Sequence, residues 1–365
     1  MEHHRLSPRH PSNALVRIHC LIAVLIGLLT LAGDAAAAGL WVANAGSSTL
    51  AEFQGKLKSG SNKSHRVITD GTDLDGPSTI AFDGAGNLWV TNFNGNTITE
   101  FTHSQFAARK KHLRSAAVKI SADAGNNLSG PEGLAFDSSG NMWVGAENGQ
   151  VVLEYTSAQL AASGNPTPNV ILNATFKFSS PSHVAFDGSG NLWVVDEGMA
   201  NGNGGSGEVF KYTHAQIAGL SAGIVSLDPV FGISLNAFSH LEGIAFDGSG
   251  NLWLADEQSN NVYEFTANQL TGTGLAKDLT PAVILSATSR GGSCHLTLDA
   301  PYGVAVDGSG NLFVSNANGV AGCHGSLAEF SAGSIASTGS PKPKVFMTGS
   351  DLNSPNALTF GPTVP

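Results

Sequence analysis

Oxygen-bearing side chains recur at two points of a segment that repeats along this chain of 365 residues. The first point, where one strand begins, carries Glu132, Glu242 and Tyr302, and the second, where the next strand ends, carries Asp196 and Asp256. A hard cation such as calcium prefers several carboxylate and carbonyl oxygens as ligands. If these side chains converge, we expect a calcium site with oxygen ligands from Asn92, Glu132, Glu242, Asp256 and Asn316.

A histidine stands among these residues. His183 is the only histidine at the start of one of these strands, where an imidazole could act as a general base or a metal ligand, and it is the catalytic candidate. The alternative for a lone histidine is a structural role. The predicted ligand-binding set is Glu132, His183, Asp196, Glu242, Asp256 and Tyr302.

Two alternatives apply to the residues at the strand ends. Asn and Asp at such positions also cap turns, because their side chains accept hydrogen bonds from nearby backbone amides. Glu147, Glu197 and Glu257 stand one place further on, where they either add to an acidic mouth or are simply solvated.

The repeat itself shows which elements carry these side chains. From Gly130 the chain reads Gly-Pro-Glu-Gly-Leu-Ala-Phe-Asp-Ser-Ser-Gly-Asn-Met-Trp-Val, and similar segments begin at Pro77, Pro181, Leu241 and Pro301. In each copy an alternating stretch leads through a Gly-rich turn into a second apolar stretch, which predicts a β-hairpin. A third strand, a polar helical turn and a fourth strand follow.

These repeated units predict an all-β fold, a six-bladed β-propeller of four-stranded antiparallel blades. Half of a sixth copy, residues 40–44, stands near the N-terminus, and the matching half, residues 354–360, stands near the C-terminus. Pairing the two halves would hide the open edges of the ring. We therefore expect a blade shared between the termini and a single domain over residues 39–365.

The repeated Pro-x-Gly-x-Ala-Phe-Asp-x-x-Gly-Asn-Leu-Trp-Val unit resembles the NHL-type repeat. It is similar to the repeats of streptogramin-lyase-like and gluconolactonase-like six-bladed propellers. The gluconolactonase-like resemblance implies a metal set of Glu, Asn and Asp in the mouth, which Glu132 or Glu242 with Asn92, Asn316 and Asp256 matches by residue type.

The streptogramin-lyase-like resemblance implies a His directly after the Pro, a Glu at the end of the Trp strand and a second His three residues later. Here Ser182 follows Pro181, Asp196 ends the strand and Met199 stands three residues on. The lyase pattern is not met, so the activity is not carried over.

The first 38 residues have the features of an export signal. Arg5, Arg9 and Arg17 precede an uncharged run over residues 20–32, which is shorter than the roughly 18 to 20 residues that span a bilayer. Small residues follow at positions 35–38, as at a cleavage site. We predict a signal peptide over residues 1–38, a periplasmic or secreted protein and no transmembrane span after processing. An uncleaved anchor is the alternative.

Cys294 and Cys323 remain once this leader is removed. Exported proteins meet oxidising conditions, so we expect a disulfide between them. Each cysteine is followed by a histidine, which gives four zinc ligands as the alternative.

The net charge of −10 argues against nucleic acid as a partner. We expect a monomeric, exported binding module that takes a protein, glycan or small-molecule ligand across its loop-rich face. The alternative is a metal-dependent lactonase, hydrolase or lyase with its site at the mouth of the central channel.

Overall fold

The computed structural model describes residues 39–107, 115–174, 178–197, 207–234, 240–288, 296–317 and 325–361. The predicted leader and both Cys294 and Cys323 lie outside these residues. In the described part of the chain no helix is long and apolar enough to cross a membrane.

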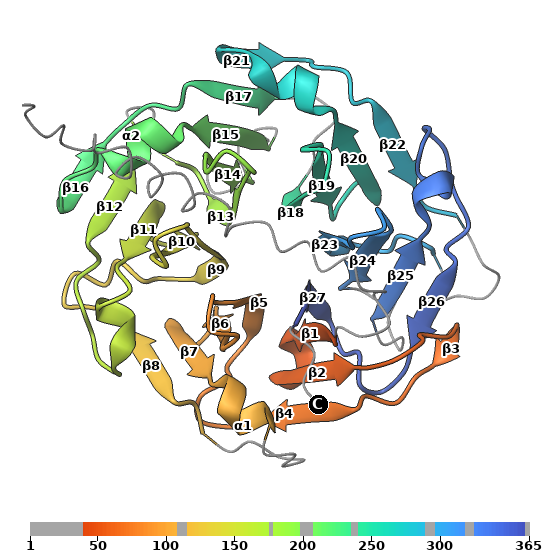
Figure 1. Cartoon of the computed structure of the whole chain (residues 1–365), viewed down its shortest axis with the longest axis horizontal. Helices are drawn as coiled ribbons and strands as arrows, with labels where there is room; N and C mark the ends of the chain where they lie inside the picture. The colour runs from red at the N-terminus through yellow and green to blue at the C-terminus, as the bar shows by residue number, and fades with distance from the viewer. Residues whose placement is uncertain are drawn as a thin grey trace, which may run out of the picture. The chain divides into compact units, whose positions relative to one another are not determined.

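Six sheets surround a central axis, each running from an inner strand at the axis to an outer strand at the rim (Figure 1). Blade I contains β27 (Pro355–Phe360), β1 (Leu40–Asn44), β2 (Thr49–Phe53) and β4 (Arg66–Thr69). Blade II contains β5 (Pro77–Phe82), β6 (Leu88–Asn92), β7 (Thr97–Phe101) and β8 (Val118–Ser121). Blade III contains β9 (Pro131–Phe136), β10 (Met142–Ala146), β11 (Val151–Tyr155) and β12 (Val170–Asn173).

The remaining three blades follow the same order. Blade IV contains β13 (Pro181–Phe186), β14 (Leu192–Asp196), β15 (Glu208–Tyr212) and β17 (Phe231–Ser234). Blade V contains β18 (Leu241–Phe246), β19 (Leu252–Asp256), β20 (Asn261–Phe265) and β22 (Val283–Ser286). Blade VI contains β23 (Pro301–Val306), β24 (Leu312–Asn316), β25 (Ser326–Phe330) and β26 (Val345–Thr348). The prediction of a six-bladed propeller is confirmed.

Three blades gain a fifth strand that the repeat did not predict. The added strands are β3 (Gly60–Ser61) on blade VI, β16 (Gly223–Ser226) on blade III and β21 (Gly274–Lys277) on blade IV, and each pairs in parallel with the outer strand. Each comes from the connection between the third and fourth strands of the next blade. The outer edge of one blade is thus covered by its neighbour, which removes a free edge.

The predicted helical turns lie in the same connections. They are α1 (His103–Ala107), η2 (Gln159–Ala161), α2 (His214–Ala218), η3 (Ala267–Thr271) and η4 (Ala332–Ser334), while η1 (Ala45–Ser47) follows β1. In α2 the Thr213 hydroxyl accepts the backbone N–H of Gln216, and the Gln216 side chain accepts the backbone N–H of Thr213. This capping box explains why a polar Thr-x-x-Gln segment starts a helical turn here.

Blade I closes the ring as predicted, since Leu40 of β1 pairs with Phe360 of β27. The core lies between blades. Trp41 packs edge-to-face on Phe82 of blade II at 6.2 Å, and Phe313 packs on Phe360 of blade I at 5.0 Å, measured between ring centroids. The recurrent aromatic residues of the second strands therefore join adjacent blades.

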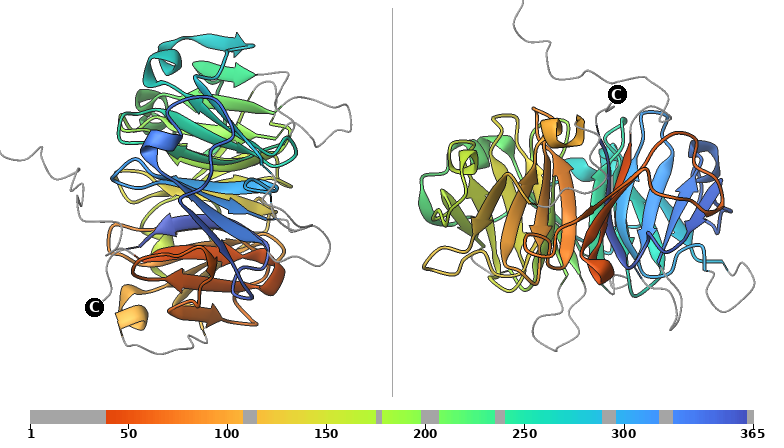
Figure 2. Two further views of the ribbon diagram at one scale, coloured as in Figure 1. Left: turned by 90° about the vertical axis from the view of Figure 1, so that its right-hand side faces the viewer. Right: turned by 90° about the horizontal axis from the view of Figure 1, so that it is seen from below.

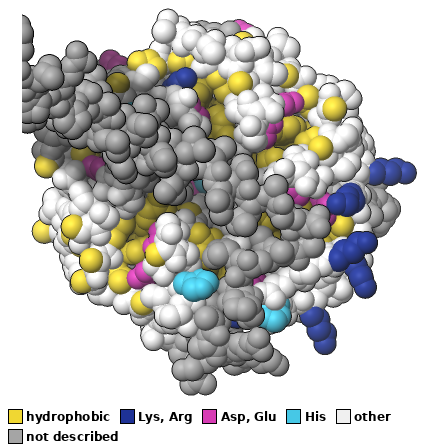
Figure 3. Space-filling view, viewed as in Figure 1, with side chains coloured by type: hydrophobic (Ala, Val, Ile, Leu, Met, Phe, Trp, Pro, Cys, Tyr) yellow, Lys and Arg dark blue, Asp and Glu magenta, His cyan; other side chains and the backbone are white. Residues whose placement is uncertain are grey.

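The edge-on views show loops on both faces of the ring (Figure 2). On the face drawn in Figure 3, Lys and Arg side chains lie mostly along one side of the rim, away from the axis. Lys56, Lys58 and Lys63 are exposed around β3, and Lys342 and Lys344 are exposed just before β26, with which β3 pairs. The basic groups of blades I and VI thus lie far from the acidic residues described next.

Candidate functional site

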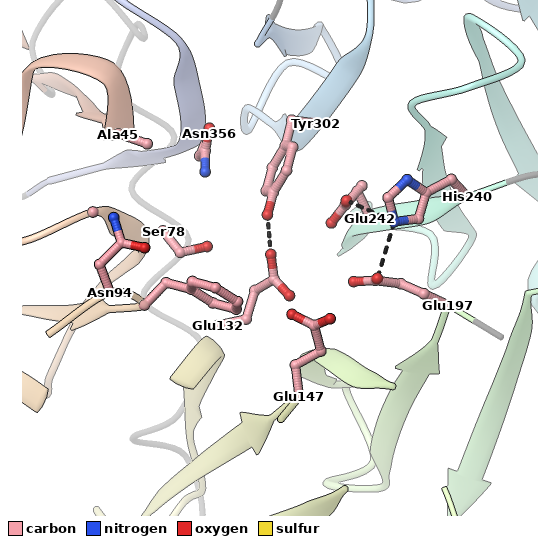
Figure 4. A pocket seen from close by; sticks show the side chains of 12 residues that line it. Ala45, Ser78, Asn94, Glu132, Glu147, Glu197, His240, Glu242, Tyr302 and Asn356 are labelled. Atoms are coloured by element: carbon pink, nitrogen blue, oxygen red, sulfur yellow. Dashed lines mark hydrogen bonds and ion pairs between the residues drawn. The ribbon is translucent and has the colours of Figure 1, made fainter. Parts of the chain in front are cut away.

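A cavity of about 250 Å³, which we call the mouth, lies where the inner strands begin (Figure 4). Five blades contribute the second residue of their inner strand: Ser78, Glu132, Glu242, Tyr302 and Asn356. Four blades contribute the residue directly after their second strand: Ala45, Phe93, Glu147 and Glu197. His240, the residue before β18, completes the acidic side, and Gly76 and Asn94 complete the opposite side.

A β-bulge in every blade places these side chains. The inner strand carries one extra residue between its first and fourth positions, for example where Leu241 pairs with Asp256 but Ile244 pairs with Leu254. A bulge bends the strand and redirects the side chains within it. Gly243 lies in this bulge, and a Cβ there would come within 2.3 Å of the Tyr302 carbonyl oxygen, so adjacent inner strands can approach only because the residue is glycine.

Glu132, His183 and Glu242 form one buried group. Their ligand atoms all lie within 4.8 Å of one another, and each residue is at most 5% exposed. The Tyr302 hydroxyl donates to Oε1 of Glu132, and the Tyr302 ring packs edge-to-face on His183 at 5.6 Å between centroids. His183 Nδ1 lies 3.6 Å from Oε2 of Glu242. Three blades thus direct two carboxylates and one imidazole at one point. This point lies at the inner end of the mouth, because Glu132 and Glu242 line the mouth whereas His183 lines a second cavity further along the channel.

Glu197, His240 and Glu242 form a second group with ligand atoms within 4.8 Å. His240 Nε2 lies 2.9 Å from Oε2 of Glu197 and 3.5 Å from Oε1 of Glu242. Its other nitrogen, Nδ1, lies 2.9 Å from Oε2 of Glu257. Nearby, the Ser180 hydroxyl donates to Oε1 of Glu147 at 3.0 Å.

Crowded, buried carboxyl groups resist ionisation. Burial, together with the neighbouring carboxylates of Glu197 and Glu147, raises the pKa of Glu132 well above its usual value. Burial and the carboxylate of Glu132 do the same to the pKa of Glu242. The pKa of Glu147 is raised for the same two reasons, burial and the charge of Glu197. A positive charge placed among these groups would be strongly favoured.

The pKa values of the two imidazoles shift in opposite directions. Hydrogen bonds to Glu197 and Glu257 raise the pKa of His240 to about 10, so this ring is protonated at neutral pH. Burial and the charge of His240 lower the pKa of His183 to about 3, so this ring is neutral. A neutral buried imidazole keeps a lone pair that a metal ion can use.

The remaining predicted residues lie apart from these two groups. The side chains of Asn92, Asp196, Asp256 and Asn316 do not line the mouth, although all four are buried. Each accepts a hydrogen bond from the backbone of the loop that enters its own blade's inner strand, from Asp75, Ser180, His240 and Asp299 respectively. The structure thus brings Glu132, His183, Glu242 and Tyr302 together, while the strand-end residues hold the loops around them.

Several residues of the site were not assigned from the sequence. From the sequence, Glu147, Glu197 and Glu257 could either belong to an acidic mouth or be solvated. In the structure Glu147 and Glu197 line the mouth, and Glu257 is paired with His240. His240 was overlooked, although the repeat contains a signal for it. The residue before the inner strand is Gly, Gly, Ser, Ala or Ser in the other blades, and only blade V has a large, titratable side chain there.

Comparisons with known proteins agree with this architecture. The strictosidine synthase-like, N-terminal family model matches residues 122–153, which include Glu132 and Glu147. No curated protein matches the sequence significantly.

Solved structures match most of the chain. A protein of unknown function from Bacteroides caccae is 13% identical, with 89% of this chain and 98% of that chain covered and a TM-score of 0.54. Streptogramin B lyase is 13% identical, with 92% and 93% covered and a TM-score of 0.52. A chain of a nidogen/laminin complex is 14% identical, with 89% and 98% covered and a TM-score of 0.56. At these identities the likeness shows the fold, and the resemblance to streptogramin-lyase-like propellers is confirmed at that level.

Proposed function

We propose that this protein binds a divalent cation at the inner end of the mouth, through Glu132 and Glu242, which line the mouth, and His183, which lines the next cavity along the channel, and that it acts there as a metal-dependent hydrolase or lyase. The observation that carries the proposal is a set of buried atoms without partners. Oε2 of Glu132, Oε2 of Glu242 and both ring nitrogens of His183 have no hydrogen-bond partner among the described residues. Leaving such atoms unsatisfied is costly, and one cation would bind Oε2 of both glutamates and one of the two ring nitrogens of His183.

The donor set bears on the choice of metal. Two carboxylates and one neutral imidazole suit a transition-metal ion such as Mn²⁺ or Zn²⁺, because Ca²⁺ takes mainly oxygen ligands. Calcium, which the oxygen-rich sequence pattern suggests, is the second ion to test. Tyr302 supports either choice, since its hydrogen bond to Oε1 of Glu132 fixes the carboxylate with Oε2 left for the cation.

A bound divalent cation would polarise a substrate carbonyl or lower the pKa of a bound water. The protein's own groups would do the rest. Glu147, held by Ser180 and with a raised pKa, can carry a proton at the edge of the mouth and deliver or accept it. Asn94 and Asn356, across the mouth from His240, offer two amides to a neutral part of the substrate (Figure 4). Phe93, which also lines the mouth, offers an aromatic ring. A cavity of about 250 Å³ suits a small substrate such as a lactone or ester.

Binding without catalysis is the second candidate, in which the protein takes a protein, glycan or small-molecule ligand across this face. We also propose export to the periplasm or beyond, on the strength of the leader predicted at residues 1–38. Both candidates agree with a propeller fold, because this architecture supports many functions.

The deciding experiment measures metal content and turnover on the same preparation. The purified protein is analysed for bound metal and assayed on a panel of lactones and esters, before and after a chelator and after adding back Mn²⁺, Zn²⁺ or Ca²⁺. We expect turnover that a chelator abolishes and the right ion restores. Glu132→Gln should lose both metal and turnover, whereas Glu264→Gln, a half-buried glutamate on β20 outside the mouth, should keep both. Metal binding without turnover on any substrate would favour the binding module, and no metal at all would overturn the proposal.

A further inference from the structure

The two groups at the inner end of the mouth share one residue, Glu242, and each uses a different oxygen of it. Oε2 of Glu242 faces His183 at 3.6 Å, whereas Oε1 of Glu242 faces His240 at 3.5 Å. Each group separately has its ligand atoms within 4.8 Å of one another. A carboxylate that directs one oxygen to each of two ligand sets is placed to bridge two metal ions.

From this geometry we infer that the mouth holds two divalent cations bridged by Glu242. The first cation is the one proposed above, with Glu132 and His183 as its other ligands, so this inference rests on the proposed function. The second cation is held by Glu197, His240 and Oε1 of Glu242. Bridged pairs of this kind lie roughly 3.5 to 4 Å apart.

The orientation of His240 supports the second site. Its Nδ1 lies 2.9 Å from Oε2 of Glu257, and its Nε2 points into the mouth at Glu197 and Glu242 (Figure 4). A metal-binding histidine typically donates its other N–H to a carboxylate in this way, which fixes the ring and strengthens it as a ligand. When Nε2 binds a cation, Glu257 keeps the proton on Nδ1.

An unpartnered oxygen gives independent support. Glu197 is 4% exposed, and its Oε1 has no hydrogen-bond partner among the described residues, although its Oε2 is paired with His240. The first group shows the same feature at Oε2 of Glu132 and of Glu242. Unpartnered buried oxygens therefore lie on both sides of the bridging carboxylate.

The charge of the mouth agrees with two cations rather than one. The carboxyl groups of Glu132, Glu147, Glu197, Glu242 and Glu257 lie in or directly behind it. One dication together with the imidazolium of His240 would balance three of the five negative charges that these carboxyl groups can carry, whereas two dications would balance four. In the cation-free protein the imidazolium of His240 partly fills that role, at the position assigned to the second cation.

Metal stoichiometry tests the inference directly. The full-length protein is loaded with Mn²⁺, freed of excess ion and analysed for manganese per chain, while electron paramagnetic resonance reports whether the spins are coupled. We expect two equivalents and an exchange-coupled spectrum. His240→Gln and Glu197→Gln should each leave one equivalent with an uncoupled spectrum. His183→Ala should also leave one, because it empties the other site, and Glu264→Gln should keep two.

The outcomes separate this inference from the proposed function. One equivalent in the unsubstituted protein, with His240→Gln unchanged in metal content, overturns the two-cation site but leaves the single-cation enzyme standing. No bound metal overturns both. If a mouth variant fails to fold, as judged by circular dichroism, the stoichiometry and spin coupling of the unsubstituted protein still decide the question.

Discussion

The Tyr302 hydroxyl donates a hydrogen bond to Oε1 of Glu132 across the central axis, from blade VI to blade III. In the ring order these two blades are separated by two others on either side, so they lie opposite each other (Figure 1). The same tyrosine ring packs on His183. One side chain from the far side of the channel therefore positions two of the proposed ligands.

Tyr302→Phe should weaken cation binding while leaving the fold intact. Without the hydroxyl, Glu132 loses the hydrogen bond that fixes its Oε1, and the carboxylate must be ordered by the metal itself. Loss of such a supporting hydrogen bond typically costs about 10- to 100-fold in metal affinity. The measurement is a titration of the apoprotein with Mn²⁺ by calorimetry, alongside the melting temperature.

Tyr155→Phe is the matched control for this substitution. Tyr155 lies on β11, outside the mouth, and its buried hydroxyl has no hydrogen-bond partner among the described residues. Removing it should leave metal affinity unchanged. Equal affinities for the Tyr302→Phe and unsubstituted proteins would show that this hydrogen bond does not position the ligand.

Gly243→Ala should destabilise the ring and disturb the mouth together. The new methyl group would lie 2.3 Å from the Tyr302 carbonyl oxygen, so β18 and β23 must separate, moving Tyr302 and Glu242. Overpacking of this kind typically costs about 1 to 3 kcal/mol. We expect a lower melting temperature and a weaker metal affinity in the same variant.

Gly248→Ala provides the comparison within the same blade. A Cβ at Gly248 meets nothing within 4 Å, and its backbone does not need a positive φ. Its effect should stay within about 0.5 kcal/mol. If both alanine variants behave alike, close approach of the inner strands is not what requires glycine at position 243.

The sequence contained most of the fold but only part of the site. The repeat occurs in five full copies, and it specifies the strand order, the shared blade and the recurring position of Trp41 and its counterparts. The site depends on where the repeats differ. His240 matters because blades IV and V bring Glu197, Glu242 and Glu257 around it, and those distances arise from the bulges and the ring closure, which no single repeat encodes.

Residue type alone does not predict which of these side chains face the mouth. Asn92 and Asn316 have suitable oxygen atoms, yet each accepts a hydrogen bond from the loop before its own inner strand. Strand-end Asn and Asp satisfy backbone amides that would otherwise be buried without partners. Whether a carboxamide faces a loop or the axis depends on the bulge next to it, which is a property of the paired strands.

Asp187→Asn should destabilise the protein at neutral pH but less so in acid. Burial would raise the pKa of Asp187, but hydrogen bonds from the Trp193 ring, the Asn191 side chain and the Ser189 backbone outweigh this and lower it. A carboxyl whose pKa is lower in the folded state stabilises that state above its unfolded pKa, and this contribution is lost as the pH falls through the folded value. The melting-temperature difference between the two proteins should stay constant down to about pH 5 and narrow as the pH falls below about pH 4. Asp75→Asn, at an exposed position, controls for the loss of one charge. A difference that widens in acid would contradict this account.

The shared blade contains a buried ion pair whose disruption should be severe. Nη1 of Arg66 on β4 lies 3.3 Å from Oε2 of Glu52 on β2, and the two side chains are 6% and 0% exposed. Arg66→Met leaves the buried Glu52 carboxylate without a positive partner, which typically lowers the free energy of unfolding by about 3 to 5 kcal/mol. Adding Glu52→Leu should recover most of that loss, because a buried pair replaced by apolar side chains is often close to neutral.

Lys119→Met is the control, because it breaks the more exposed pair between Lys119 and Asp73. It should change the free energy of unfolding by less than about 1 kcal/mol. Denaturant unfolding of the four proteins measures these differences. If Arg66→Met cost no more than Lys119→Met, the buried carboxylate would have to be protonated or hydrated in the folded blade, and the pair between β2 and β4 would not stabilise blade I.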